Sequence, residues 1–187
     1  MPHRLAAITF ASGLLLASAA AYGHDMVSLL EARRLGVTVQ KFDISCGAAA
    51  EATLLHLKFN DNVSERDVAL HLMTRKEYLE HPQIIRAREG FSLLDLKRYA
   101  VSRGYRAEGL GQMTLDDLIA VAPAIVPLRL YGYNHFVVFR GIVGDRVVLA
   151  DPAFGNRVMP LWRFQDTWIE LKPLGHVAFV IKRAGEK

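Results

Sequence analysis

The pattern of hydrophobic and polar positions changes at Pro123. Before it, apolar residues recur at helical spacing, which predicts helices over residues 24–36, 48–57, 64–73, 92–103 and 114–122. Ser64, Ser92 and Thr114 each stand at the start of a segment with acidic residues in its first turn, so they are expected to be N-caps. Residues 75–90 are polar and contain Pro82, and we interpret them as a surface connection.

After Pro123 the pattern becomes extended. Short runs rich in Val, Ile, Leu and Phe predict strands over residues 124–131, 135–143, 146–150 and 177–182, with a hairpin turn at Gly144 and Asp145. Residues 105–107 are expected to form a further short strand, and residues 160–168 fit one turn of helix. Helices followed by an antiparallel sheet predict the α+β class.

Composition and charge restrict the classes of protein that this chain could be. With 187 residues, 51% hydrophobic and 22% charged, the chain is long enough for one domain with a full core. The net charge of +4 comes from lysines and arginines scattered in ones and twos rather than in a block. Together with the absence of a nucleic-acid-binding motif, this predicts that the protein does not bind nucleic acid.

Residues 1–23 have the features of a secretory signal peptide. Arg4 provides the positive charge, residues 5–21 are uncharged, and Ala21 and Gly23 are small residues at a cleavage site before His24. We therefore predict an exported, periplasmic protein whose mature domain is residues 24–187. The alternative is an uncleaved anchor, in which case the protein would contact the membrane.

Cys46 is the only cysteine, and it lies where a polar turn meets an alanine-rich helical segment. The free N–H groups and the positive end of a helix stabilise a thiolate, so this is a suitable place for a nucleophile. The alternative is a small buried side chain without a chemical role. A lone cysteine cannot form an internal disulfide, and its presence in an exported chain favours a chemical role.

A thiolate nucleophile needs a base, and the base needs an orienting group. His135 opens the most apolar strand, and Asp151 ends the returning strand of the same hairpin. A strict two-residue turn would place Asp151 opposite Val138, about 10 Å along the strand from His135. The pairing therefore requires a bulge, a strong twist or a wider turn.

Gln40 precedes Cys46 by six residues, and its amide could donate to the carbonyl oxygen under attack, together with the Cys46 backbone N–H. The other histidines have no partner of this kind in the sequence. No paired His/Cys spacing or HExxH motif is present, so we predict no metal and no other cofactor. The histidines set aside are His3, His24, His56, His71, His81 and His176.

Taken together, these residues resemble the bacteriocin-processing, double-glycine cysteine peptidases, which are papain-like. The resemblance runs through Q-x5-C-G-A-A at residues 40–49, G-x-S-L-x-x-L at 90–96, H-F-V-V at 135–138 and A-D-P-A-x-G at 150–155. It implies a papain-like fold with Cys46 as nucleophile, His135 as base, Asp151 as orienting acid and Gln40 as oxyanion donor. Familiar members are cytoplasmic domains of ABC exporters, whereas this chain resembles the stand-alone exported members.

The resemblance implies a peptidase that cuts a secreted or leader-bearing polypeptide, such as an amyloid-type protein or one handled by its export machinery. Cleavage after small residues such as Gly-Gly is a property of the familiar members. Two alternatives remain at this point. One is a peptide-binding module with an idle thiol that assists secretion, and the other is a cell-wall endopeptidase of the Cys-His type.

Overall fold

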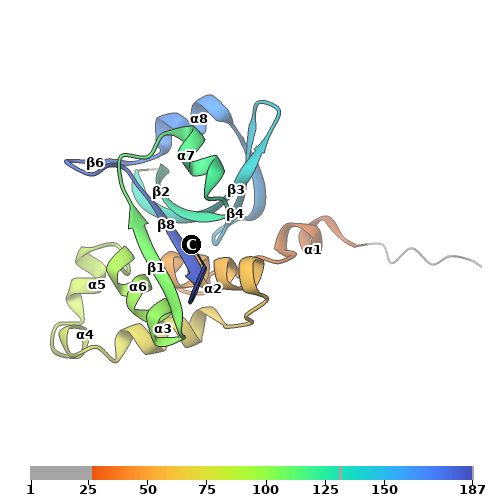
Figure 1. The fold of residues 1–187 in the computed structure, drawn as a ribbon. Helices are drawn as coiled ribbons and strands as arrows, with labels where there is room; N and C mark the ends of the chain where they lie inside the picture. The colour runs from red at the N-terminus through yellow and green to blue at the C-terminus, as the bar shows by residue number, and fades with distance from the viewer. Residues whose placement is uncertain (1–26, 131, 187) are drawn as a thin grey trace, which may run out of the picture.

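A computed structural model describes residues 27–130 and 132–186 (Figure 1). The predicted signal peptide, residues 1–23, lies outside the described residues. Within the described part, no helix is long and apolar enough to cross a membrane. The helices are α1 (Leu29–Arg34), α2 (Cys46–Phe59), α3 (Glu65–Met73), α4 (Lys76–Glu80), α5 (Gln83–Ala87), α6 (Leu93–Ser102), α7 (Leu115–Ala120) and α8 (Leu161–Thr167).

A six-stranded antiparallel sheet forms the centre of the molecule, in the order β1-β8-β2-β3-β4-β5. The strand near the C-terminus, β8, therefore lies between β1 and β2. A separate two-stranded sheet pairs β6 with β7. The strands are β1 (Tyr105–Leu110), β2 (Ala124–Leu130), β3 (Tyr133–Val143), β4 (Arg146–Asp151), β5 (Gly155–Pro160), β6 (Glu170–Leu171), β7 (Gly175–His176) and β8 (Ala178–Arg183). The predicted α+β class is confirmed.

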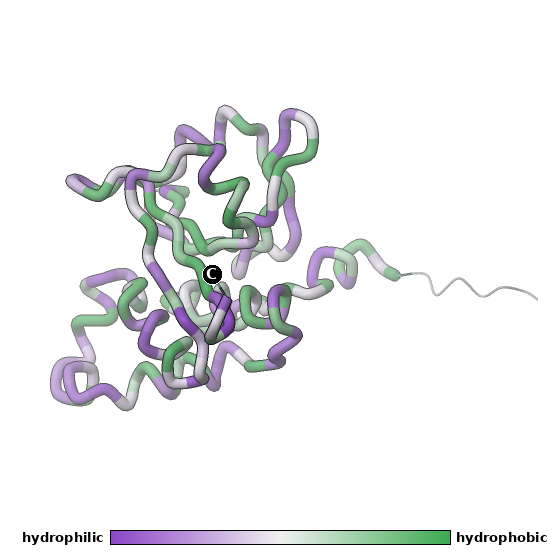
Figure 2. Tube along the Cα trace, viewed as in Figure 1, coloured by the Kyte–Doolittle hydropathy of each residue, from purple (hydrophilic) through white to green (hydrophobic). Residues whose placement is uncertain are grey.

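The sheet is buried on both faces, and this divides the core into two clusters. Val138 and Ala150 join the cluster beneath α2 and α6, while Val137 and Leu149 join the cluster covered by α7 and α8. Side chains of successive strand residues point to opposite faces, which explains why neighbours in sequence belong to different clusters. Figure 2 shows hydrophobic residues along the central strands and many hydrophilic residues on the outer helices α3 to α5.

Capping explains why several helices start where the sequence predicts. Ser64, Ser92 and Thr114 each accept the backbone N–H of an aspartate three residues on, and that aspartate accepts the backbone N–H of the cap. This reciprocal capping box satisfies donors that a helix start otherwise leaves free.

The interpretation of residues 75–90 as a surface connection was wrong. The segment forms α4 and α5, which bury Tyr78 and Ile85 in the core cluster beneath α2. Each helix has only five residues, too few to show a hydrophobic period in the sequence. Strand β5 was also not predicted, because Asn156 and Arg157 leave it with only two adjacent apolar residues before Pro160.

A β-bulge in the β3–β4 hairpin decides where Asp151 lies. Near the turn the strands pair as a strict two-residue hairpin, with Val143 opposite Arg146, but the register shifts by one residue between Phe139 and Gly141. Val138 then pairs with Ala150, so Asp151 falls across from Val137 instead of Val138. The one-residue shift puts Asp151 on the same face as His135.

Candidate active site

Cys46 is the first residue of α2, with Ser45 as its N-cap residue. Its side chain is 5% exposed, yet it lines two cavities that meet at the thiol and that both include His135. We call these two cavities together the cleft. The positive end of a 14-residue helix thus points at the sulfur from one side, and the cleft gives a substrate access from the other.

His135 lies between the thiol and a carboxylate. Its Nε2 atom is 2.7 Å from Asp151 Oδ1, and its ring also forms a hydrogen bond with the Cys46 side chain. Since Nε2 is engaged by Asp151, Nδ1 is the nitrogen left to face the sulfur. The structure therefore brings three of the four predicted site residues into one chain of contacts.

The charges in this chain of contacts favour protonated His135. Burial alone lowers the pKa of His135, but the hydrogen bonds to Asp151 and Cys46 and their negative charges outweigh it and raise the pKa to about 9. Burial alone raises the pKa of Asp151. The hydrogen bond from His135, the positive charges of His135 and Arg157 and the Ala153 N–H outweigh burial, so the pKa of Asp151 is lowered overall. An imidazolium beside a carboxylate stabilises a thiolate at Cys46.

Arg157 is a neighbour of the site that the sequence did not reveal. Its Nε lies 2.8 Å from Asp151 Oδ2, and its guanidinium packs over the Phe154 ring at 5.2 Å. Asp151 Oδ1 also accepts the Ala153 N–H at 2.8 Å. Both oxygens of this fully buried carboxylate thus have a positive or donor group beside them, which holds it charged and oriented toward His135.

Gln40 lines the same cavity as Cys46 and His135. Its Nε2 donates to the Phe42 carbonyl at 3.0 Å and more weakly to the Asp43 carbonyl at 3.5 Å. One amide hydrogen is therefore committed to the loop, and the weaker contact is the one that a substrate carbonyl could replace. Its backbone N–H donates to the Pro152 carbonyl at 2.8 Å, which ties the Gln40 loop to the turn after Asp151.

The buried carboxylate of Glu65 holds the loop between Gln40 and Cys46, and the sequence did not indicate this role. It accepts the Lys41 backbone N–H at 3.0 Å and the hydroxyl of Ser45, the residue before the thiol. Glu65 was expected only as an acid in the first turn of its helix. A contact across 20 residues leaves no local signal that could have shown it.

Apolar side chains line one arm of the cleft, a cavity of about 450 Å³. One wall comes from the start of α6 and the other from the β6–β7 hairpin and the residue before it. The apolar wall residues are Leu93, Leu94, Ile169, Leu171 and Leu174. Such a surface suits apolar side chains of an extended or helical peptide.

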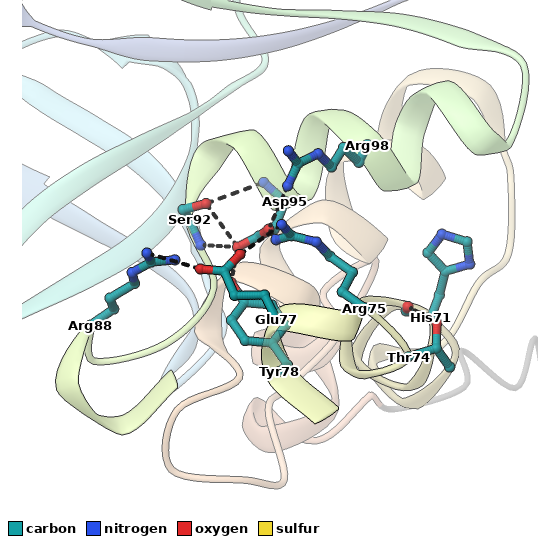
Figure 3. A network of polar contacts seen from close by, with 9 residues as sticks. All are labelled: His71, Thr74, Arg75, Glu77, Tyr78, Arg88, Ser92, Asp95 and Arg98. Atoms are coloured by element: carbon teal, nitrogen blue, oxygen red, sulfur yellow. Dashed lines mark hydrogen bonds and ion pairs between the residues drawn. The ribbon is translucent and has the colours of Figure 1, made fainter. Parts of the chain in front are cut away.

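A network of polar contacts around the buried Asp95 supports the α6 wall (Figure 3). Asp95 accepts hydrogen bonds from Arg75 and Tyr78, and from the backbone N–H of Ser92 at 2.9 Å. Arg88, which lines the cleft, pairs with Glu77 at 3.1 Å in the same network. The helices α4 and α5 are thereby fixed against the start of α6. Among the described residues, no cluster of three or more His, Cys, Asp or Glu side chains could hold a metal ion.

Comparison with known proteins decides the family. The profile of the peptidase C39 family matches residues 34–172. The chain belongs to this family. This match confirms the resemblance to C39 peptidases found in the sequence.

Two curated relatives are similar over most of this chain. Both are named "Probable functional amyloid protease FapD", one from Pseudomonas aeruginosa with 38% identity and one from Pseudomonas fluorescens with 36% identity. Each alignment covers 75% of this chain but only 60% of the relative, so the matched region spans well under the full length of the FapD proteins.

Solved C39 peptidase domains share the fold. A double-glycine-motif protease from an AMS/PCAT transporter, in complex with the leader peptide, has a TM-score of 0.61 and 22% identity over 79% of this chain and 91% of its own. The peptidase domain of Streptococcus ComA has a TM-score of 0.61 and 20% identity over 79% of this chain and 98% of its own. These likenesses confirm the papain-like C39 fold.

Proposed function

We propose that this protein is an exported cysteine peptidase that cuts a peptide bond in a secreted or leader-bearing polypeptide. The observation that carries the proposal is the position of His135, with its ring hydrogen-bonded to the Cys46 thiol on one side and 2.7 Å from Asp151 on the other. The family assignment supports peptide-bond hydrolysis as the chemistry of these residues.

In the first step, the Cys46 thiolate attacks the carbonyl carbon of the scissile bond. The negative charge moves to the carbonyl oxygen, where the Cys46 backbone N–H at the helix start and the Gln40 amide donate to it. Protonated His135 then gives its proton to the leaving amine, and a thioester remains on Cys46.

In the second step, a water replaces the amine product. Neutral His135 takes a proton from this water, whose oxygen attacks the thioester, and the thiolate is released together with a carboxylic acid. Asp151 keeps the ring oriented through both steps, and Arg157 keeps Asp151 charged. Neither step needs a metal ion or a cofactor.

The name shared by the two FapD relatives supports an amyloid-type protein, or a factor in its export, as the substrate. The leader peptide bound to the solved transporter protease supports a leader-bearing polypeptide as the more general class. Both ideas agree with the apolar arm of the cleft, which suits apolar side chains next to the cut. We include cleavage after Gly-Gly in this proposal.

Export is supported by the charge, apolar core and cleavage-site pattern of residues 1–23. If the protein is periplasmic, N-terminal sequencing of the protein from that compartment will begin at His24. A protein that retains Met1 and sediments with membranes would contradict cleavage and indicate an anchor.

The substrate is tested by comparing secreted and surface proteins from cells carrying wild type or Cys46→Ala. We expect a precursor that accumulates only in the variant, and a purified precursor that wild type cuts at least about a thousandfold faster than Cys46→Ala. Identical protein profiles, together with no cleavage of candidate precursors, would contradict the proposal.

Iodoacetamide labelling at pH 6 separates the peptidase from a binding module. A thiolate paired with His135 is labelled much faster than a free thiol at this pH, and His135→Ala should slow the labelling. Slow labelling of native Cys46 would favour the binder. Release of cleaved stem peptides from muropeptides would instead favour the cell-wall enzyme.

A further inference from the structure

A second cavity, of about 590 Å³, lies outside the cleft and is lined by three arginines from different elements. Arg33 comes from α1, Arg140 from the bulge of β3, and Arg157 from β5. We call it the arginine pocket. In the described part of the chain, none of the residues that line it is acidic. A concave surface with several guanidinium groups and no carboxylate has a positive potential that attracts anions.

In the part of the chain that the structure describes, two of the three arginines, Arg33 and Arg140, have no acid paired with them. Arg157 is paired with Asp151, but that carboxylate is buried and also serves His135. The Arg140 side chain donates to the neutral amide oxygen of Asn156 at 3.0 Å. Within residues 27–130 and 132–186, neither Arg33 nor Arg140 forms an ion pair with a carboxylate within 4.0 Å. The nearby acid of α1, Glu31, caps its own helix through Ser28.

The other half of the arginine pocket is apolar. Val148, Phe154 and Val158 line it, and Phe154 and Val158 are 50% and 56% exposed. A small inorganic anion would use only the arginines. A peptide segment with a carboxylate next to an apolar side chain would use both halves.

The arginine pocket is held in place by specific contacts. The Asn156 amide donates to the Leu35 carbonyl at 2.8 Å and to the Ala32 carbonyl at 3.3 Å, which fixes α1 to β5. Gly155, with a φ of +77°, lets the backbone of Arg33 approach so closely that an added Cβ would lie 2.3 Å from its carbonyl oxygen. Arg33 is therefore brought to the pocket by packing that requires glycine.

One turn separates the arginine pocket from the cleft. Ala153 lines the cleft beside Cys46 and His135, and the next residue, Phe154, lines the arginine pocket. Two residues about 3.8 Å apart along the backbone thus face the two cavities. A polypeptide held in the cleft has only to cross this turn to reach the arginines.

We propose that the arginine pocket binds an acidic segment of the polypeptide substrate, with a carboxylate between Arg33 and Arg140 and a neighbouring apolar side chain against Phe154 and Val158. This inference rests on the proposed function for the identity of its ligand as a substrate. It adds a requirement on the substrate beyond those of the cleft, namely an acidic residue at a distance from the cut.

The test measures binding without turnover, on the mature chain carrying Cys46→Ala. The probe is a fluorescein-labelled peptide of alternating Glu and Val, and the reference is the same peptide with Gln in place of Glu. We expect the Glu peptide to bind more tightly, and Arg33→Gln or Arg140→Gln to weaken its binding at least about threefold, as seen for the stronger exposed ion pairs. Arg146→Gln is the matched control, because Arg146 is exposed on β4 and does not line the pocket.

Equal binding of the two peptides, or equal losses in Arg140→Gln and Arg146→Gln, would overturn the proposal. Full displacement of the Glu peptide by inorganic phosphate at matched ionic strength would also overturn it, since the site would then be a simple anion site. Circular dichroism checks that each variant is folded. Because the assay needs no cleavage, its result is independent of whether Cys46 acts as a peptidase.

Discussion

In the proposed mechanism the chemistry of the cleft depends on His135, because its two ring nitrogens have separate partners. Nε2 is 2.7 Å from Asp151, and the other side of the ring serves the thiol. Few side chains could replace it, since the position requires both a donor to a buried carboxylate and a base beside a sulfur. Because its pKa is raised to about 9, the ring is protonated at neutral pH and can donate a proton.

The pKa of His135 predicts how stability depends on pH. Because the folded-state pKa is about 9 and the ordinary value is 6.5, the protonated ring stabilises the fold fully below about pH 6.5, and this is lost as pH rises through 9. Asp151→Asn should therefore lower the free energy of unfolding by on the order of 2 to 3 kcal/mol at pH 6 and by much less at pH 10. Urea unfolding at both pH values measures it.

Asp145→Asn is the control for this prediction, because Asp145 is exposed in the hairpin turn and does not contact His135. Its effect should be small and independent of pH between 6 and 10. A constant difference between wild type and Asp151→Asn over that range would show that the pKa of His135 is not raised.

In the proposed mechanism, Glu65 positions the nucleophile Cys46 by holding the loop between Gln40 and Cys46. Glu65→Gln weakens the contacts to the Lys41 N–H and the Ser45 hydroxyl, so we expect kcat to fall about tenfold or more with little change in KM. The free energy of unfolding should fall by about 1–3 kcal/mol. Steady-state kinetics with a cleaved peptide measures the split between kcat and KM.

Asp67→Asn separates this role from the stability of α3. Asp67 completes the capping box of the same helix but does not contact the loop. We expect this variant to destabilise the helix while keeping kcat. If both variants lose kcat in proportion to stability, Glu65 has only a structural role.

At the scale of elements, the β3–β4 bulge is the feature that assembles the site. Without it, Asp151 would lie opposite Val138 and face the other side of the sheet from His135. Gly141 ends the irregular stretch with a φ of +143°, a backbone conformation that a β-branched residue avoids.

Gly141→Val should therefore disturb the pairing of His135 and Asp151 from a distance. We expect a loss of about 1–3 kcal/mol in the free energy of unfolding and a fall in activity larger than that loss explains. Gly109→Val in β1 is the control, since Gly109 has an ordinary φ and open space around it. NMR titration of His135 gives a direct reading, and an unchanged pKa in Gly141→Val would contradict the prediction.

The same hairpin shows how far sequence alone could go. The sequence predicted the strands, the turn at residues 144–145 and the capped starts of α3, α6 and α7, because these features depend on local patterns. It showed that a bulge or its equivalent was needed, but not where, because register depends on packing between strands. Arg157 and Glu65 were missed for the same reason, since each acts through a partner distant in sequence or on a neighbouring strand.

At the scale of the whole molecule, the two core clusters are joined through the sheet, and α2 forms the centre of one of them. Glu51 lies in this helix, five residues after the thiol, and is fully buried. Among the described residues, neither of its oxygens has a partner with hydrogen-bond geometry. Burial raises its pKa well above the usual range, although the nearby Ala100 backbone opposes the shift slightly.

Glu51 is therefore expected to limit the stability of the whole domain at neutral and alkaline pH. A carboxyl group with a raised pKa keeps its proton when folded and loses it when unfolded, so the free energy of unfolding falls as pH rises above about 4.5. Glu51→Gln removes this effect and should be more stable than wild type by at least about 1 kcal/mol at pH 8.

At pH 4, Glu51→Gln and wild type should unfold at nearly the same denaturant concentration. Glu80→Gln is the control, because Glu80 is exposed on α4. A difference between Glu51→Gln and wild type that does not grow with pH would show that Glu51 is charged in the folded protein.

The strand order has a consequence for when the fold is completed during synthesis. Strand β8, near the C-terminus, lies between β1 and β2, and its residues Phe179 and Ile181 complete the cluster beneath α2. A chain that is still emerging from the ribosome lacks this strand. Until it is made, β1 has no neighbour in the sheet and the cluster beneath α2 lacks two of its buried side chains, so the last strand to be synthesised is the one that completes both.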